Sequence, residues 1–293
     1  MIPTVWEGQK MQRLSVKENG FYGCFFPVRD QGEKAIIVVT GSDGGILGAK
    51  AIAKFYAGAK ISALALAFFK VKDTPKCLSE IPIEYIENAV CWLKAQGYRK
   101  IAVDGISKGA ELALLAASRL PDIGCVIARS PSYFVCEGIG ARKSAANTSS
   151  WSWRSKALPY APFTERQIQI KKDLWRTKEF TVKRYYTGIK VREQDIIPVE
   201  QINGPILLLS SQIDTVWPAA ENGEKICKRL EEHSFRYPYR HQIYETVSHY
   251  LTPLNIGIMR LLFKIEREQP KACRQARGHA RVLALDWLEN IWH

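Results

Sequence analysis

Residues 100–120 read KIAVDGISKGAELALLAASRL. The first part is a short apolar run typical of a buried strand, and the Ala- and Leu-rich second part predicts a helix that ends before Pro121. Between them, residues 105–109 place Ser107 two positions from a glycine on either side. Because a side chain at either glycine would push the helix off the strand, the pattern predicts a sharp turn that holds the Ser107 hydroxyl clear of the sheet.

A G-x-S-x-G turn between a strand and a helix is the nucleophile elbow of α/β-hydrolases. Gly and Ser are common turn formers, so the motif alone is also compatible with an ordinary connection; the strand before it and the helix after it favour the elbow. The backbone N–H of Lys108 lies at the predicted start of the helix, where free amides and the helix dipole favour an oxyanion. A serine needs a base and an acid to react, and the rest of the chain must supply them.

Strands and helices alternate around this turn. Further strands are predicted at 21–28, 35–40, 62–69, 124–128, 204–210 and 240–244, and further helices at 47–59, 83–96, 219–230 and 272–292. This alternation predicts an α/β fold with a mostly parallel, doubly wound sheet. Residues 130–198 break the rhythm with Ser, Pro and aromatic residues and then a basic, helix-like run at 164–186. We interpret about 137–198 as a cap inserted at the sheet edge.

Composition indicates one main domain. A chain of 293 residues that is 46% hydrophobic can bury a large core, and we expect an irregular segment with short strands at 1–30 followed by a hydrolase domain at 31–293. The seven cysteines form no C-x-x-C pair, and no histidine stands at metal-ligand spacing. Free buried thiols, a reducing compartment and no metal or cofactor are therefore expected.

Partners are limited by charge and hydropathy. No run resembles a signal peptide or a transmembrane helix, which favours a cytoplasmic protein without a membrane partner. Residues 142–192 carry 13 Lys and Arg against three Asp and Glu, and so hold +10 of the net charge of +13. Because the charge belongs to one segment, we expect no nucleic-acid partner; the segment is either a solvated face or a site for an anionic ligand.

A base and an acid follow two other predicted strands. Asp214 comes just after the strand at 204–210, and His249 just after the strand at 240–244. Loops that follow parallel strands share one edge of the sheet, and Ser, Asp, His is the order that α/β-hydrolases use. We therefore predict that His249 takes the proton from Ser107 and that Asp214 orients the imidazole.

The other histidines are weaker candidates for the base. His233 and His241 precede or begin a strand, at the opposite edge, and His279 and His293 belong to the last predicted helix. A histidine is more often structural than catalytic, so position and order are what favour His249.

A glycine-rich loop, GSDGG at 41–45, follows the strand at 35–40. It lacks the Lys-Ser/Thr of a phosphate-binding loop, and in a hydrolase it would supply the second oxyanion N–H, from Ser42 or Asp43; a plain turn is the alternative. Asp43 and Asp104 are the alternative acids to Asp214. Asp43 falls where amides are needed, and Asp104 lies at the foot of the elbow.

Further motifs suggest a family. They are GISKGAELALLAAS, SPS and EG within SPSYFVCEG, SSWSW, ALPY, PVEQINGPILLLSSQIDTVWP and SHYLTP. Over roughly residues 30–292 the chain resembles the acyl-CoA thioesterase and bile acid-CoA:amino acid N-acyltransferase family, with a dienelactone-hydrolase-like fold. The resemblance implies an α/β-hydrolase acting on acyl-CoA, with the triad roles on Ser107, Asp214 and His249. Fuller members carry a β-sandwich domain in front, for which some 30 residues are too few.

Four functions stay open at this point. Transferases of the family tend to carry Cys at the nucleophile and thioesterases Ser, so Ser107 favours an acyl-CoA thioesterase over transfer to an amine. The others are an amino acid N-acyltransferase, a dienelactone-hydrolase-like carboxylesterase, and a binding module that keeps only the fold.

Overall fold

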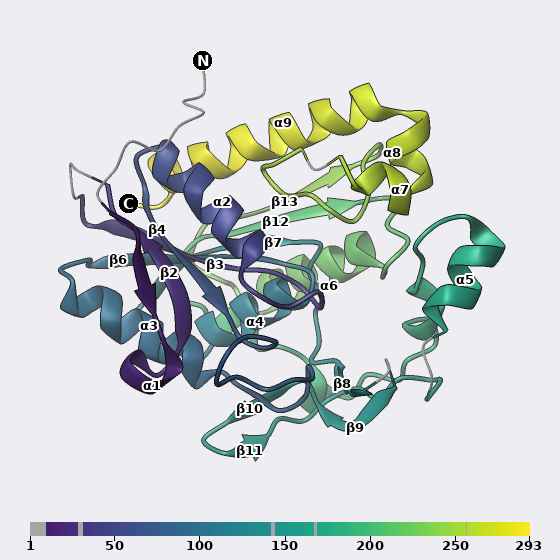
Figure 1. The fold of residues 1–293 in the computed structure, drawn as a ribbon, viewed down its shortest axis with the longest axis horizontal. Coiled ribbons are helices and arrows are strands. Elements are labelled where there is room, and N and C mark those ends of the chain that lie inside the picture. Colours follow the sequence, from purple (N-terminus) through teal and green to yellow (C-terminus); the bar gives the residue numbers. More distant parts are fainter. Residues whose placement is uncertain (1–9, 29–31, 142–143, 167–168, 256) are drawn as a thin grey trace.

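The centre of the molecule is an eight-stranded sheet with the order β1-β2-β4-β3-β6-β7-β12-β13 (Figure 1). The computed structural model describes residues 10–28, 32–141, 144–166, 169–255 and 257–293. The strands are β1 (Gln12–Leu14), β2 (Tyr22–Phe26), β3 (Lys34–Val39), β4 (Ser62–Ala67), β6 (Lys100–Ile106), β7 (Ile123–Arg129), β12 (Ile206–Ser211) and β13 (Tyr239–Tyr244). Strand β2 is antiparallel to β1 and β4, and the other pairs are parallel. The predicted mostly parallel sheet is confirmed, and the predicted strands end within two residues of the observed ones.

Strand β3 shows why the inner strands are apolar throughout. Ala35, Ile37 and Val39 pack into the core on one face of the sheet, and Ile36 and Val38 pack into the core on the other. Successive side chains of a strand point to opposite faces, so a sheet covered on both faces needs apolar residues at every position.

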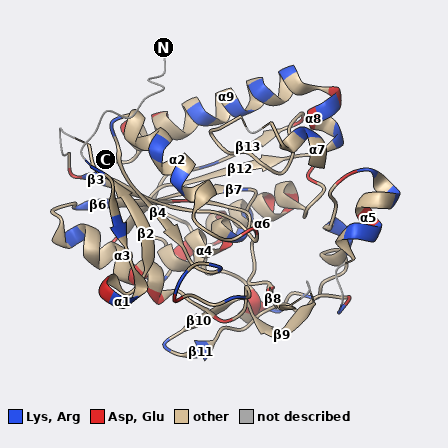
Figure 2. Ribbon diagram, in the orientation of Figure 1, with Lys and Arg blue, Asp and Glu red and all other residues tan. Residues whose placement is uncertain are grey.

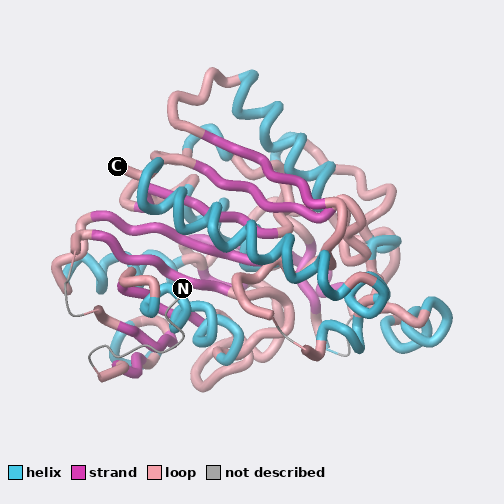
Figure 3. Tube along the Cα trace, turned by 90° about the horizontal axis from the view of Figure 1, so that it is seen from above, coloured by secondary structure: helices cyan, strands magenta, loops and turns pink. Residues whose placement is uncertain are grey.

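Helices cover both faces (Figures 1 and 3). One face carries α3 (Glu84–Ala95), α4 (Lys108–Ala117) and α6 (Ala219–Glu232), and the other carries α2 (Leu47–Gly58) and α9 (Pro270–Asp286). All ten residues of α4 are buried, because the cap covers the side of this helix that faces away from the sheet. This burial explains why the elbow helix has no polar stripe in its sequence.

The segment after β7 forms the cap. It contains β8 (Glu137–Ile139), β9 (Ala145–Ser149), β10 (Trp151–Trp153), β11 (Lys156–Ala157), α5 (Ile170–Thr177) and the short 3-10 turns η2 (Lys183–Tyr185), η3 (Glu193–Asp195) and η4 (Val199–Gln201). Strand β10 pairs with β11 and with β5 (Ile81–Pro82), which comes from the loop before α3. The cap is therefore attached to the rest of the fold through its own small sheet.

The helical prediction for 164–186 is wrong outside α5 and η2, and its residues 167–168 lie outside the described chain. Helix α5 ends where Lys178 adopts a left-handed conformation, with φ 55°. Beyond it, the N–H groups of Val182 and Lys183 donate to the carbonyl of Thr215 at 3.1 Å. Hydrogen bonds to the loop that carries Asp214 thus replace the bonds that would continue the helix. The basic composition of the segment gives no sign of this replacement.

The remaining elements lie at the chain ends. Residues 10–28 form β1, α1 (Val16–Asn19) and β2, so part of the segment predicted as irregular belongs to the main sheet. The short helices α7 (Met259–Leu262) and α8 (Lys264–Glu268) precede α9, and η5 (Trp287–Ile291), a π-helical turn, extends α9. All seven cysteines are free. Within the described ranges, no helix combines the length and hydrophobicity that crossing a bilayer requires.

Candidate active site

The turn between β6 and α4 holds Ser107 in a strained conformation, with φ 58° and ψ −123°. A Cβ on Gly105 would lie 2.1 Å from the carbonyl oxygen of Gly109, and a Cβ on Gly109 would lie 2.4 Å from that of Thr40. Both contacts are with backbone atoms that cannot move away cheaply. The two glycines are therefore required for the close approach of helix and strand that holds the Ser107 backbone in place.

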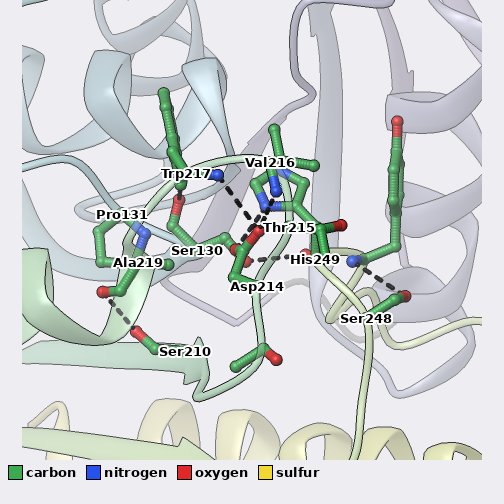
Figure 4. A network of polar contacts seen from close by, with 12 residues as sticks. Ser130, Pro131, Ser210, Asp214, Thr215, Val216, Trp217, Ala219, Ser248 and His249 are labelled. Carbon is green, nitrogen blue, oxygen red and sulfur yellow. Dashed lines mark hydrogen bonds and ion pairs between the residues drawn. The ribbon is translucent and has the colours of Figure 1, made fainter. Parts of the chain in front are cut away.

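Asp214 and His249 meet across the loops that follow β12 and β13. The Nδ1 of His249 lies 2.7 Å from Oδ2 of Asp214, and both side chains are buried (Figure 4). The other carboxylate oxygen, Oδ1, accepts hydrogen bonds from the N–H groups of Val216 and Trp217 at 2.8 and 3.3 Å. These bonds orient the carboxylate, and the carboxylate in turn keeps the proton of a neutral imidazole on Nδ1.

In that neutral tautomer the second nitrogen of His249, Nε2, carries no proton. Nε2 is buried and has no hydrogen-bond partner among the described residues. Ser107 and His249 line the same cavity, but within the described part of the chain no hydrogen bond joins the Ser107 hydroxyl to Nε2 of His249. Bonds of this kind are often long without substrate and tighten when it binds, so the arrangement is compatible with proton transfer from Ser107 to His249.

The cavity has a volume of about 420 Å³. Five of the six predicted site residues line it: Ser42, Asp43, Ser107, Lys108 and His249; Asp214 is bonded to the imidazole of His249. Most of the remaining wall is apolar, and the cap and α7 contribute Ile139, Ile170, Phe180, Val182, Met259 and Leu262 to it. Such a cavity favours an apolar group next to the serine.

The predicted oxyanion donors lie on either side of Ser107. Lys108 is the first residue of α4, so its N–H has no carbonyl partner within the helix. A Cβ on Gly41 would lie 3.1 Å from the Cβ of Ser107, so the loop that carries Ser42 and Asp43 passes directly beside the serine. The start of α4 and the loop of Ser42 and Asp43 are therefore both close to the hydroxyl.

Two tyrosines in the cavity wall are uncharged. Burial raises the pKa of Tyr250 to about 12, and the Asp43 carboxylate adds to this rise. Burial also holds the pKa of Tyr186 well above its ordinary value, with smaller contributions from Cys136, Glu111 and Asp214. Both phenols thus stay neutral at physiological pH.

Ser130, directly after β7, connects the loops that carry Asp214 and His249 (Figure 4). Its Oγ donates to the carbonyl oxygen of His249 at 2.8 Å, and its own carbonyl accepts a bond from the indole Nε1 of Trp217 at 3.1 Å. The residue belongs to the SPS motif of the family resemblance, but the sequence assigned it no role. We find that it joins the His249 loop to the acid loop.

Arg129 makes the corresponding links to the elbow. Its carbonyl accepts the N–H of Ser107 at 2.9 Å, and its Nη1 donates to the carbonyl of Leu251 at 2.9 Å. The guanidinium is buried against Asp104, which also accepts a hydrogen bond from Tyr56 at 2.5 Å. Asp104, which the sequence offered as an alternative to Asp214, thus forms an ion pair with Arg129.

Three rival histidines have other partners. His241 lies 2.9 Å from the Oγ of Ser210, and burial lowers its pKa to about 4. His233 is exposed and contacts a carbonyl of its own helix, α6. His279 hydrogen-bonds Tyr244. None of these three lines the cavity.

Ser107, Lys108, Asp214 and His249 fall within a stretch that matches a known family, and Ser42 and Asp43 precede it. Residues 81–265 match the family described as BAAT / Acyl-CoA thioester hydrolase C terminal. The chain belongs to this family. The mitochondrial acyl-coenzyme A thioesterase 2 of Mus musculus is 28% identical over 249 residues, covering 83% of this chain and 51% of the relative. Acyl-coenzyme A thioesterase 1 of Homo sapiens is 29% identical over 250 residues, covering 83% and 55%. The chain spans about half the length of these relatives.

Solved structures resemble this member of the family in fold. A putative dienelactone hydrolase from Klebsiella pneumoniae superimposes with a TM-score of 0.59 at 12% identity, covering 96% of this chain and 98% of that one. A sugar hydrolase from Lactococcus lactis gives 0.62 at 14% identity, covering 96% and 97%. At identities this low, the likeness concerns the fold alone, and it confirms the predicted α/β-hydrolase class.

In the described part of the chain, no cluster of three or more His, Cys, Asp or Glu side chains could hold a metal ion.

Proposed function

We propose that this chain is a serine hydrolase that cleaves acyl-CoA thioesters to a free acid and CoA through an acyl-Ser107 intermediate. The observation that carries the proposal is the largely apolar cavity whose wall includes both Ser107 and His249. Membership of the acyl-CoA thioester hydrolase family supports the same reaction. The names of the relatives give acyl-CoA as their substrate, and this chain spans 51% and 55% of the two described above. We therefore propose acyl-CoA as the substrate of this chain.

In the first half-reaction, His249 Nε2 accepts the hydroxyl proton of Ser107 while the serine oxygen attacks the thioester carbonyl carbon. The negative charge on the carbonyl oxygen is stabilised by the N–H of Lys108 and by an N–H of Ser42 or Asp43. When the carbon–sulfur bond breaks, the sulfur leaves with the proton from His249. The products of this step are free CoA and an ester of Ser107.

In the second half-reaction, water replaces the serine. His249 takes a proton from the water, whose oxygen attacks the ester carbonyl, and returns the proton to the oxygen of Ser107 as the ester bond breaks. Asp214 holds Nδ1 throughout and stabilises the imidazolium that forms in each half. The acid leaves and the hydroxyl of Ser107 is restored.

The two ends of the substrate require different surroundings. The acyl chain suits the apolar side chains of the cap and α7 that line the cavity. Coenzyme A carries several negative charges, which suit the Lys and Arg concentrated in residues 142–192. Thioester hydrolysis uses both features, whereas hydrolysis of a small neutral ester uses neither fully.

The test is a panel of acyl-CoAs from short to long, followed by release of free thiol, with the Ser107→Ala variant as the matched control. We expect release by the wild type alone, with a preference among chain lengths. Glycine or taurine is added in parallel, because an amide product in place of the free acid would establish transfer. Small phenyl esters hydrolysed faster than every acyl-CoA would establish a carboxylesterase instead.

A further inference from the structure

Large apolar side chains are exposed around the cavity. Seven such side chains are exposed in the described chain, and four of them belong to or directly adjoin elements that wall the cavity. They are Leu47 on α2 (80% exposed), Trp175 on α5 (76%), Leu261 on α7 (73%) and Ile258 just before α7 (55%). Single exposed apolar residues are ordinary, but their concentration on elements that line one cavity indicates a contact surface.

The same helices also point apolar residues inward. Ile170 of α5 and Met259 and Leu262 of α7 line the cavity, while Trp175 and Leu261 face outward. Trp175 and Leu261 thus lie on the outer side of the cavity wall. The cavity is lined by other residues of the same helices, so these two side chains are free to contact a partner.

The end of α5 and the helix α7 form one continuous surface. Arg267 donates to the carbonyl of Lys178 at 2.8 Å and to that of Arg260 at 3.1 Å, and so joins the two elements. Trp175 lies within one turn of Lys178, whose ammonium is 5.3 Å from the indole ring. Figure 1 shows α5 and α7 at the same end of the molecule.

This surface is basic. The exposed residues of α5 and its C-cap include Lys171, Lys172, Arg176 and Lys178 (Figure 2). The acid within α5, Asp173, is buried and hydrogen-bonded to the hydroxyl of Tyr185. On α8, the exposed Glu268 is paired with Lys264 at 3.6 Å. Exposed cations therefore outnumber exposed acids around Trp175.

We propose that this rim, formed by the start of α2, by α5 and by α7, docks onto an anionic lipid surface. An exposed tryptophan and aliphatic side chains surrounded by Lys and Arg are the combination that binds at a membrane interface. A second copy of the chain is disfavoured, because a twofold contact would bring the same cations against each other. Docking of this kind needs no spanning helix, so it revises only the sequence-based expectation that the chain has no membrane partner.

Co-sedimentation with vesicles tests this directly and does not depend on catalysis. The whole chain is mixed with phosphatidylcholine vesicles with or without phosphatidylserine, at low and at high salt. We expect binding only to the vesicles that contain phosphatidylserine, and less of it at high salt. Replacing both Lys171 and Lys172 by Gln should weaken the partition about twenty-fivefold, since each cation near an anionic surface contributes roughly fivefold.

Trp175→Ser should weaken binding at least about fivefold through the lost apolar contact. Val282→Ser is the matched control, because Val282 is also exposed, at 59%, but lies on α9, a helix that contributes no residue to the cavity wall. Absence of binding at low salt, or equal binding by the two variants, would overturn the proposal. So would sedimentation velocity showing a dimer that Trp175→Ser dissociates, since that result would assign the surface to a second copy.

Discussion

The backbone of Ser107 is fixed by its neighbours, so its hydroxyl can be removed without disturbing the turn. Gly105 and Gly109 allow the strand and helix to touch, and the N–H of Ser107 is held by the carbonyl of Arg129. Ser107→Ala keeps the Cβ and these contacts. We expect kcat for acyl-CoA to fall by at least about 10³-fold, because the covalent step is lost, with an unchanged melting temperature. A variant that kept near-normal turnover would exclude Ser107 as the nucleophile.

Ser130 is predicted to position His249 without touching substrate. Ser130→Ala removes one of two hydrogen bonds to the His249 carbonyl, which keeps the bond from the N–H of Leu251, at a cost of about 1 kcal/mol in the free energy of unfolding. Because the imidazole is then held less well, kcat should fall roughly tenfold with little change in KM. Steady-state kinetics on one acyl-CoA measure both quantities.

Ser132→Ala is the control for this variant. Ser132 is equally buried and belongs to the same SPS motif, but its Oγ donates to the carbonyl of Phe134 in the cap. A similar loss of stability with unchanged kcat is expected. If the two variants lowered kcat equally, the effect of Ser130 would be one of general stability.

At the scale of elements, the His249 loop is attached to the C-terminal helices through one carboxylate. Glu266 of α8 accepts a hydrogen bond from the hydroxyl of Ser248 at 2.7 Å and two from Arg277 of α9, at 2.5 and 3.0 Å. Glu266→Gln should lower the free energy of unfolding by roughly 3 kcal/mol, because it leaves the buried Arg277 guanidinium without its ion-pair partner and with only Asn255 as a full acceptor. Chemical denaturation measures the loss.

The same carboxylate gives a pH dependence. Burial opposes ionisation of Glu266, but the hydrogen bonds from Arg277 and Ser248 outweigh it and lower its pKa. A lowered folded pKa stabilises the protein above the unfolded value near about 4.3, and this stabilisation is lost as the pH falls through the folded pKa. Wild type should therefore lose its advantage over Glu266→Gln on acidification below about pH 4.3. Melting temperatures that stayed equally far apart down to pH 2 would contradict this.

At the scale of the whole molecule, the net charge of +13 affects how the proposed substrate arrives. An anionic substrate is attracted by the basic insertion, and added salt screens that attraction. The kcat/KM for acyl-CoA should fall roughly three- to tenfold between low and high salt. A neutral phenyl ester hydrolysed by the same serine is the control, and equal salt dependence for the two substrates would argue against electrostatic attraction.

Most of the central sheet was predictable because its signals are local. Strand β3 shows an unbroken apolar run, and the elbow requires two glycines at fixed spacing from Ser107. The cap was not predictable in detail, since β8 to β11 are at most five residues long and β10 pairs with β5, which lies far along the chain. Short strands of this kind have no periodicity to recognise.

The contacts that position the site were also invisible in the sequence. Ser130 and His249 are 119 residues apart, and their bond joins a side chain to a carbonyl. Such a bond can form with any residue whose backbone is in place, so residue type carries almost no signal for it. The SPS motif marked the position of Ser130 without indicating its partner.

The amino-acid sequence by itself determined which strands and helices form and which serine stands at the turn, because apolar spacing and glycine sterics act over a few residues. Only the tertiary structure decided that Asp214 meets His249, that Arg129 and Ser130 connect the three loops, and that Trp175 lies outside the cavity wall. Those outcomes depend on how distant segments pack, and packing is a property of the whole chain.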